Sequence, residues 1–515
     1  MPNEVIADIN NRNHLAWSID KSINMDYSKK LADLEKNKTG LSQGVYDQKK
    51  LGLLEEKKAE LSKLGEERIN LLNNLKIMVL GSGPLAQFVS GGLMGLGIGT
   101  IYVVGNEIVS RNDSYDFLVT KESNLGKSKV DEIVARMNEI NDYNNFVPVF
   151  SRFSSALTNS FYPSDMIIDA TNSSVSKNKV LRYCIDNKIP LISASSSFRN
   201  SRVSSYKPNS APIRLKDSVN LEAVIHQELD GLSQDIVSSG IIAGIILEEV
   251  RKQKFSMSKT DFPLKNFQVV NYNPYSKTRN NKLRDLPKCA KTYANKRVLV
   301  AGAGALGNFV AMELALLGVG QLDILDMDSV EVSNLNRQIN FDKSNIGKEY
   351  KKATVLFDRL KKLNPSINGT GIVAKLEMTS DNLIKEGNYD VLLGCFDNKI
   401  ARQTLDHFAE KYNIPYVDGG CSTNAGQVVS FIPGYNQKVT EQVNFPDPSN
   451  SGNQVGCAIV AQANPSIITS NAIIGSATVA EALKILSGQN YGDVGGSFNY
   501  RSNSPDRIWL DPYVP

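Results

Sequence analysis

The residues with the clearest chemical potential lie in one short stretch, residues 297–338. An apolar run there ends in a glycine-rich turn formed by Gly302, Gly304 and Gly307. Turns of this kind let phosphate groups approach the backbone N–H groups at the start of a helix, so the pattern predicts a nucleotide site. A second apolar run ends on Asp326, whose carboxylate we expect to bond a ribose.

The loop that follows is rich in polar side chains, namely Asp328, Asn334, Arg337 and Gln338. A cation in this place does not assist a nicotinamide reaction, whereas a fixed arginine stabilises the negative charge that develops on phosphates. The loop therefore favours phosphoryl or acyl-phosphate chemistry. An oxidoreductase that uses a dinucleotide stays as the rival enzyme class, because the glycine pattern alone is common to both.

Strands and helices must bring these residues to one edge of a sheet. The apolar runs 298–301 and 322–325, with a helix between them, predict a strand–helix–strand unit. A third apolar run, 391–394, ends just before Asp397, a hard oxygen donor of the kind that Mg²⁺ prefers. Because strand ends meet at one edge of an open parallel sheet, we expect Asp397 beside the phosphates. Its structural alternative is to cap the next helix, and the two roles are compatible. Arg402 is expected to brace either that helix or the acidic site.

Three segments in this region occur in a fixed order: DMDSVEVSNLNRQ, NIGKEYKKA and LLGCFDNKIAR. With their spacing they resemble the ThiF/MoeB/HesA superfamily, which includes the enzymes that activate ubiquitin and ubiquitin-like proteins. The resemblance covers roughly residues 290–490. It implies adenylation of the C-terminal carboxylate of a protein or peptide at the expense of ATP, with Asn334, Arg337 and Gln338 as nucleotide contacts.

The resemblance also assigns a lysine. The family lysine falls on Lys352, which lies twelve residues before Asn364, and Lys351 stays open because two residues are inserted nearby. Family enzymes often supply an arginine in trans from an N-terminal element. Residues 27–30 match that element only weakly and Arg12 is remote, so the sequence leaves this arginine unassigned.

An earlier part of the chain repeats the same pattern. Residues 75–109 lie over residues 296–330 without a gap, NLGKSKV repeats NIGKEYK, and IPLISASSS repeats IPYVDGGCS. An apolar helix recurs near 238–250 and 470–486. Colinear repeats of this length predict two tandem Rossmann-like (ThiF-type) α/β domains with mainly parallel sheets. The first 75 residues are charged with leucines at helical spacing, which predicts one or two amphipathic helices that pack against the first domain or bind a partner.

The two copies differ where a nucleotide or metal would be held. Four positions change from the later to the earlier copy: Gly307 to Ala86, Asp326 to Gly105, Arg337 to Asp116, and Asp397 to Asn172. Each change removes a phosphate, ribose or metal contact, and Asp116 puts an anion where a triphosphate needs a cation. We therefore predict that only the later copy binds ATP, which is similar to the pairing of inactive and active domains in ubiquitin-type activating enzymes.

Five cysteines, at positions 184, 289, 395, 421 and 457, include no CxxC pair, so neither a zinc ribbon nor a disulfide framework is expected. Cys457 follows a polar segment with no helix or strand pattern and precedes the late apolar helix. This segment, about residues 435–465, is similar to the crossover loop that carries the acyl-accepting cysteine of activating enzymes. The resemblance makes Cys457 the candidate nucleophile, which neighbouring cations or a helix N-terminus would activate.

The composition limits the classes of protein to which this chain can belong. A length of 515 residues with 41% hydrophobic and 22% charged residues is typical of a globular protein of about three domains. A net charge of +4 is too small to suggest nucleic-acid binding. The uncharged stretch 77–106 is long enough for a membrane span, but its many glycines favour strand, turn, helix and strand. An odd cysteine count without a signal peptide predicts the cytoplasm.

The expected organisation is an N-terminal helical region over residues 1–75, an inactive adenylation domain over 76–280 and an active one over 281–515. We call the last two the N-terminal half and the C-terminal half. The leading hypothesis is that the C-terminal half adenylates the C-terminal glycine of a ubiquitin-like protein with ATP and Mg²⁺. Cys457 would then form a thioester and pass the acyl group to a conjugating enzyme.

The alternative hypothesis is a ThiF/MoeB-type adenylyltransferase that acts on a sulfur-carrier protein or a modified peptide without thioester transfer. Either way the expected partner is a small protein or peptide, and neither nucleic acid nor a membrane is expected. A homodimer is left open.

Overall fold

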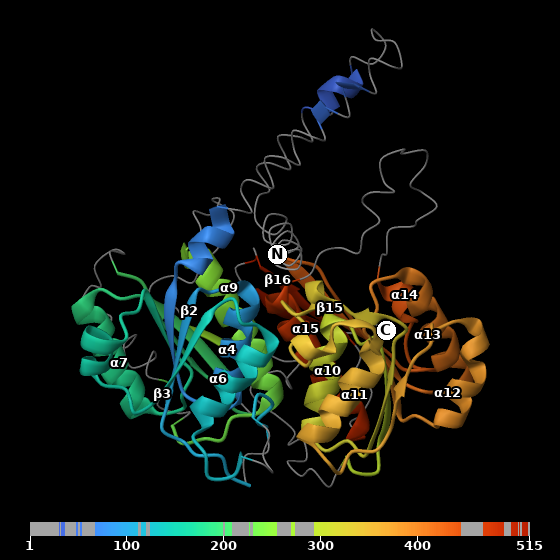
Figure 1. Cartoon of the computed structure of the whole chain (residues 1–515). Helices are drawn as coiled ribbons and strands as arrows, with labels where there is room; N and C mark the ends of the chain where they lie inside the picture. The colour runs from blue at the N-terminus through green and yellow to red at the C-terminus, as the bar shows by residue number, and fades with distance from the viewer. Residues whose placement is uncertain are drawn as a thin grey trace.

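A computed structural model describes most of both halves and little of what precedes them (Figure 1). The described residues are 30, 32–36, 48–49, 52–53, 67–111, 115–119, 124–198, 201–208, 226, 230–254, 269–272, 293–443, 467–488, 496–502, 504 and 507–512. Within residues 1–75, the described positions before residue 74 are helical.

The N-terminal half contains one mixed sheet whose described strands lie in the order β3-β2-β1-β4-β5-β6-β7. The first five in this order run parallel, and β6 and β7 are antiparallel additions. Their bounds are β1 Lys76–Leu80, β2 Thr100–Gly105, β3 Asn145–Phe150, β4 Met166–Asp169, β5 Leu191–Ser195, β6 Ser201–Tyr206 and β7 Val269–Tyr272.

The C-terminal half repeats this order strand for strand, as β12-β9-β8-β13-β14-β15-β16, with β17 added at the end. Here too the first five strands are parallel and the others antiparallel. Their bounds are β8 Arg297–Ala301, β9 Gln321–Leu325, β12 Gly371–Ile372, β13 Val391–Gly394, β14 Tyr416–Cys421, β15 Ala425–Phe431, β16 Gly496–Arg501 and β17 Ile508–Pro512. The predicted fold class, two tandem α/β units with mainly parallel sheets, is confirmed.

Helices recur in the same places. After the glycine turns come α4 (Pro84–Leu96) and α10 (Ala305–Leu316), and after the next loops come α6 (Lys129–Ile140) and α11 (Lys352–Leu363). Later pairs are α7 (Ser174–Asn187) with α13 (Lys399–Tyr412), and α9 (Ile236–Lys254) with α15 (Ile468–Leu486). The short helices α12 (Asp381–Gly387) and α14 (Val439–Gln442) belong to the C-terminal half, as does a small hairpin of β10 (Ser329–Val330) and β11 (Gly347–Lys351).

The two late apolar helices explain why the halves stay together. Nearly every described residue of α9 and α15 is buried, because most of each helix is apolar and its buried charged residues near the C-terminal end are ion-paired within the interior. They pack against one another between the two sheets (Figure 1), where Gly244 of α9 leaves room for Ile473 of α15. A single core cluster runs through both halves, so the interface resembles a domain interior.

A pair of aromatic rings marks the symmetry of this interface. Phe88 on α4 and Phe309 on α10 occupy equivalent places in the repeat, and their ring centroids stack 6.1 Å apart. Two equivalent residues can touch one another only near an approximate two-fold axis between the halves. The repeat is therefore arranged like a dimer within one chain.

The uncharged stretch 77–106 forms β1, the glycine turn, α4 and β2, as predicted. Among the helices that the structure describes, none combines the length and apolar character needed to cross a membrane.

Candidate functional site

The glycine turn of the C-terminal half leaves the start of α10 open. Gly302 has a φ of 109°, a conformation that favours glycine, and a Cβ there would lie 2.8 Å from the carbonyl oxygen of Cys395. A Cβ at Gly307 would overlap the carbonyl oxygen of Gly302. Gly304, the N-cap of α10, has no atom within 4 Å of its Cβ position. The turn is therefore tight on its inner side and accessible at the helix N-terminus, which is the arrangement that binds anions.

Asp326 lies directly after β9, beside the same turn. Its carboxylate accepts hydrogen bonds from the N–H groups of Ala303 at 2.7 Å and Asp328 at 2.8 Å. Burial raises the pKa of Asp326, although those hydrogen bonds and the nearby Lys352 ammonium partly offset this. Asp326 thus ties the loop after β9 to the glycine turn.

Lys352 reaches into this cluster from the first position of α11. Its Nζ lies 2.9 Å from Oδ2 of Asp328, and only 11% of its side chain is exposed. Lys351 instead lies on β11, where its Nζ donates to Oγ of Ser329 at 3.1 Å. Of the two lysines that the sequence left open, Lys352 is the one whose charge acts on Asp326.

The remaining nucleotide candidates lie in the loop between β10 and β11. Asn334 is buried and its Oδ1 accepts from the N–H of Glu331 at 3.0 Å, which caps a short 3₁₀ turn at Val332–Asn334. Arg337 is half-buried, and its Nη1 donates at 2.8 Å to the carbonyl of Ser333 and to Oδ1 of Asn336. Burial lowers the pKa of Arg337.

Gln338 is 3% exposed, and its Oε1 has no hydrogen-bond partner within the described part of the chain. The contacts of Asn334 and Arg337 hold these two side chains within their own loop.

Asp397 is exposed just before α13. Its loop begins at Cys395, whose carbonyl lies beside Gly302, so the loop adjoins the glycine turn. The helix cap is Asn398, whose side chain accepts from the N–H of Ala401 at 2.9 Å. The alternative that Asp397 caps this helix is therefore wrong, and its carboxylate faces solvent.

A buried ion pair lies beneath the loop that carries Asp397. Arg402 of α13 lies 3.2 Å from Oδ1 of Asp418 on β14 and donates to the carbonyl of Phe396 at 2.7 Å. Burial raises the pKa of Asp418 to about 6, while Arg402 and the Tyr416 hydroxyl act in the opposite direction. Arg402 thus braces the loop that carries Asp397.

The N-terminal half keeps part of this arrangement. Lys129, the first residue of α6, lies 3.4 Å from Oε2 of Glu107, which corresponds to the pair of Lys352 with Asp328. The same lysine also lies 3.3 Å from Oδ2 of Asp116, which is 2% exposed. The carboxylate that replaces Arg337 is therefore neutralised from within the chain.

The helix N-terminus of this half is covered. Oε1 of Gln234 accepts from the N–H of Leu85 at 3.0 Å, while its Nε2 donates to the carbonyl of Ala170 at 2.8 Å. A Cβ at Gly83, the counterpart of Gly304, would lie 2.8 Å from Oε1 of Gln234. A glutamine amide oxygen thus takes the place that is open at α10. A cavity of about 890 Å³ lies over this edge of the sheet.

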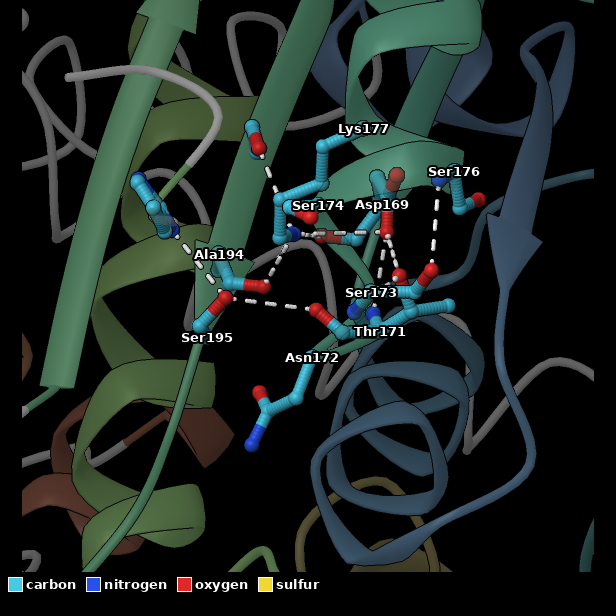
Figure 2. Close-up of polar contacts among 12 residues, drawn as sticks. Asp169, Thr171, Asn172, Ser173, Ser174, Ser176, Lys177, Ala194 and Ser195 are labelled. Carbon is cyan, nitrogen blue, oxygen red and sulfur yellow. Dashed lines mark hydrogen bonds and ion pairs between the residues drawn. The ribbon is translucent and has the colours of Figure 1, made fainter. Parts of the chain in front are cut away.

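Asn172, the counterpart of Asp397, is tied to the backbone. Its Nδ2 donates to the carbonyls of Ser196 at 2.7 Å and Leu232 at 2.8 Å. Behind it lies Lys177, the counterpart of Arg402, whose Nζ points between Asp169 and Ala194 (Figure 2), 3.3 Å from Oδ1 of Asp169. A buried cation is therefore retained in the N-terminal half. Its acidic partner, Asp169, lies on β4, whereas Asp418 lies on β14, which is the counterpart of β5.

The three described cysteines do not suit nucleophilic chemistry. Burial raises the pKa of the thiols of Cys184 and Cys395, and raises that of Cys421 to about 11. A thiol with so high a pKa is almost wholly protonated at neutral pH. Cys457 and Cys289 lie outside the described residues, as do most of the predicted crossover loop and the N-terminal elements around Arg12 and residues 27–30.

Sequence reasoning missed two features of the site. Nothing in the local pattern around Gln234 indicates that it covers the start of α4, because the contact joins residues 149 positions apart. The retained lysine–acid pair of Lys129 and Glu107 was also missed. An alignment of the two halves that places the two-residue insertion before Lys352 would have paired Lys129 with Lys352.

Comparison with known proteins finds one family in both halves. A family model described as "ThiF family" matches residues 55–252 and 276–508. The sulfur carrier protein ThiS adenylyltransferase of Bacillus subtilis is 33% identical over 151 residues, which are 29% of this chain and 44% of that protein. Its Escherichia coli counterpart is 32% identical over 196 residues, which are 38% of this chain and 73% of that protein.

This chain thus spans less than half the length of the Bacillus relative. Among solved structures, Escherichia coli MccB with MccA-N7isoASN is 20% identical with a TM-score of 0.39, covering 43% of this chain and 66% of that one.

Proposed function

The chain belongs to the ThiF family, and from this we propose that its C-terminal half uses ATP to adenylate the C-terminal carboxylate of a small carrier protein. The carrier would be a ubiquitin-like or sulfur-carrier protein that ends in glycine. The curated relatives carry the name adenylyltransferase, which supports the reaction class.

One observation carries the proposal: an accessible helix N-terminus stands beside a fixed carboxylate and a fixed lysine. The start of α10 is open at Gly304, and Asp326 and Lys352 lie at the same sheet edge. An open helix N-terminus and an ammonium group suit phosphates, and the carboxylate suits a ribose hydroxyl. No such combination occurs among the described residues of the N-terminal half, where Gln234 covers the helix start and Gly105 replaces the acid.

In the first step, an oxygen of the carrier carboxylate attacks the α-phosphorus of ATP. The bond from that phosphorus to the bridging oxygen breaks, pyrophosphate leaves, and an acyl-adenylate remains. Negative charge builds on the phosphates in the transition state. We assign Arg337, Lys352 and the N–H groups at Gly304 to stabilise it, each with an effect on the order of 10²–10³ in rate.

The acidic residue available for Mg²⁺ is Asp397. Within the described residues no group of three acidic, histidine or cysteine side chains could hold a metal unaided. A single exposed carboxylate fits Mg²⁺, which is usually bound by one or two carboxylates together with substrate phosphates. Bound there, the ion would neutralise charge on the leaving pyrophosphate.

Asn334 and Gln338 complete the proposed nucleotide contacts. Both side chains are buried in the loop of Arg337. The Oε1 atom of Gln338 has no hydrogen-bond partner in the described part of the chain. A buried acceptor without a partner favours a donor from a ligand, such as a ribose or adenine group.

For the second step, we propose that the Cys457 thiolate attacks the acyl carbon. A carbon–sulfur bond forms, the bond from that carbon to AMP breaks, and the thiol proton passes to solvent. The raised pKa of Cys184, Cys395 and Cys421 argues against those three thiols. The choice of Cys457 over Cys289 rests on the resemblance of the segment around Cys457 to the crossover loop. Transfer to a conjugating enzyme would follow.

The names of the relatives favour the second candidate function, adenylation for sulfur transfer without a thioester. Both candidates share the first step and differ in whether a thiol of this chain takes the acyl group.

The experiment mixes the full chain with ATP, Mg²⁺ and a small carrier that ends in glycine. Exchange of labelled pyrophosphate into ATP is expected for either candidate, and its absence would refute adenylation. On a non-reducing gel, a thiol-sensitive adduct lost in Cys457→Ala is expected for the thioester route. Exchange without an adduct, or an adduct that survives in Cys457→Ala, would refute the role of Cys457.

A further inference from the structure

The loop of Arg337 is held from the other half of the molecule. Arg136 of α6, in the N-terminal half, has 8% of its side chain exposed and lies 2.7 Å from Oδ2 of Asp342. Its Nη2 donates to the carbonyl oxygen of Asn340 at 3.3 Å. One buried guanidinium therefore fixes two points at the end of this loop, which we call the phosphate loop, residues 333–342.

A second contact fixes the middle of the phosphate loop. A Cβ at Gly95 of α4 would overlap the carbonyl oxygen of Asn336 and would lie 2.8 Å from Cδ1 of Ile468. The side chain of Asn336 in turn accepts from Arg337 at 2.8 Å. Because α4 has no side chain at Gly95, Asn336 can lie against the helix and hold the arginine.

The C-terminal half makes the reciprocal contact. Arg359 of α11 corresponds to Arg136 of α6, and its Nη2 donates to the carbonyl oxygen of Phe117 at 2.7 Å. Phe117 lies in the N-terminal half, in the loop that corresponds to the phosphate loop. Burial lowers the pKa of Arg359, and the positive charge of Arg136 adds to this, so both arginines lie in one interface cluster.

We propose that Arg136 and Gly95 are positioning residues through which the N-terminal half sets the phosphate loop, and with it Arg337, for the reaction of the C-terminal half. This rests on the proposed function of that half. The N-terminal half then contributes to catalysis although its own helix N-terminus is covered.

The reciprocal arginines provide a matched test. Both variants, Arg136→Ala and Arg359→Ala, remove a buried guanidinium from the same interface. Arg136 bonds directly to Asp342 and Asn340 of the phosphate loop, whereas Arg359 bonds to Phe117 and acts on Asp342 only through its charge. A misplacement of about 1 Å in a positioned group can cost about 100-fold in rate. We expect kcat/KM for ATP in pyrophosphate exchange to fall about 10- to 100-fold in Arg136→Ala and less than about threefold in Arg359→Ala.

Arg136→Lys keeps a cation within reach of Asp342 and should recover part of the loss. Equal losses of kcat/KM in the two alanine variants, in step with equal losses of melting temperature, would show that Arg136 serves stability alone and would overturn the proposal. Failure of the lysine variant to recover any activity would also count against it.

Hydrogen exchange separates this proposal from the proposed function. In the protein without nucleotide, Arg136→Ala should speed amide exchange in residues 334–341, and Arg359→Ala should speed it in residues 115–119. Unchanged exchange in residues 334–341 would overturn the positioning role even if activity falls. If the wild-type protein exchanges no pyrophosphate with any carrier, the proposed function fails, while the amide exchange still tests the contact.

Two glycines of α4 give a second matched pair. At Gly91 an added Cβ would have Leu118 as its nearest neighbour, 4.0 Å away, whereas at Gly95 it would overlap Asn336. Glycine to alanine gains similar helix propensity at both places. We expect Gly95→Ala to lower kcat/KM about tenfold and Gly91→Ala to leave it unchanged. Equal activity of the two variants would refute the role of Gly95.

Discussion

The two halves of this chain have the same architecture but different contacts for a nucleotide. Strand order, the helix pairs and the apolar central helices are repeated. A lysine–acid pair is repeated as well, as Lys129 with Glu107 and as Lys352 with Asp328. A lysine in this place is therefore not by itself a sign of nucleotide binding.

The halves diverge at the groups that would touch the phosphates. In the C-terminal half the start of α10 is open, and the loop after β10 carries Arg337, which we propose contacts the phosphates. In the N-terminal half Gln234 covers the start of α4 and Asp116 binds Lys129. We infer that a nucleotide fold can lose its ligand site through a few polar substitutions, because its stability comes from the apolar core and not from the site.

The largest expected effect comes from Arg337→Ala. If Arg337 contacts the phosphates as we propose, its removal should lower the rate of pyrophosphate exchange about 10²- to 10³-fold. The matched control is Asp116→Asn, which changes the corresponding position of the N-terminal half and should leave exchange within about threefold of wild type. A strong loss of pyrophosphate exchange in Asp116→Asn together with normal exchange in Arg337→Ala would indicate that the N-terminal half, and not the C-terminal half, binds the phosphates.

The next effect concerns the glycine turn. Gly307→Ala forces a Cβ against the carbonyl of Gly302, so the turn must move and the N–H groups shift away from the phosphates. We expect kcat/KM for ATP to fall about 10- to 100-fold, measured by exchange at varied ATP concentration. Ala86→Gly makes the opposite change in the N-terminal half, and a second bound nucleotide in that variant would contradict the account.

A smaller effect should appear in the pH dependence of stability. Burial raises the pKa of Asp418 from 3.8 to about 6, with Arg402, Tyr416 and Asp406 as its charged or polar neighbours. An acid whose pKa is higher in the folded chain favours folding below its unfolded pKa, and that contribution is lost as pH rises through the folded value. The melting temperature of wild type relative to Asp418→Asn should therefore fall between about pH 4 and pH 7. Parallel melting curves for the two proteins would disprove this.

The smallest effect is expected from Gln234→Ala. This variant loses hydrogen bonds to Leu85 and Ala170, each worth about 1 kcal/mol. The melting temperature should fall by a few degrees, which scanning calorimetry would measure. Pyrophosphate exchange should not change. One nucleotide should still bind per chain, because Gly105 and Asp116 supply neither the acid of Asp326 nor the cation of Arg337. A second bound ATP would show that Gln234 alone closes the N-terminal site.

Much of the fold could be predicted because it depends on local patterns. The apolar runs at 298–301, 322–325 and 391–394 coincide with β8, β9 and β13 to within one residue. The repeat predicted the second sheet, because an identical order of strands and turns leads to an identical topology.

The site was less predictable because its decisive contacts join distant residues. Asn398 rather than Asp397 caps α13, and the two alternatives differ by one position, which a spacing argument does not resolve. The contacts of Gln234 with Leu85 and of Arg136 with Asp342 depend on how the two sheets and their loops pack, and that packing has no local sequence signal.

The central claim is that ATP binds in the C-terminal half alone. The most direct test is to crosslink 8-azido-ATP to the wild-type chain with Mg²⁺ present and to map the labelled peptides by mass spectrometry. We predict label in peptides from residues 297–352, at one nucleotide per chain, and none in residues 76–180. Label in the peptides around Gly83 and Lys129, or no label that excess ATP displaces, would contradict the account.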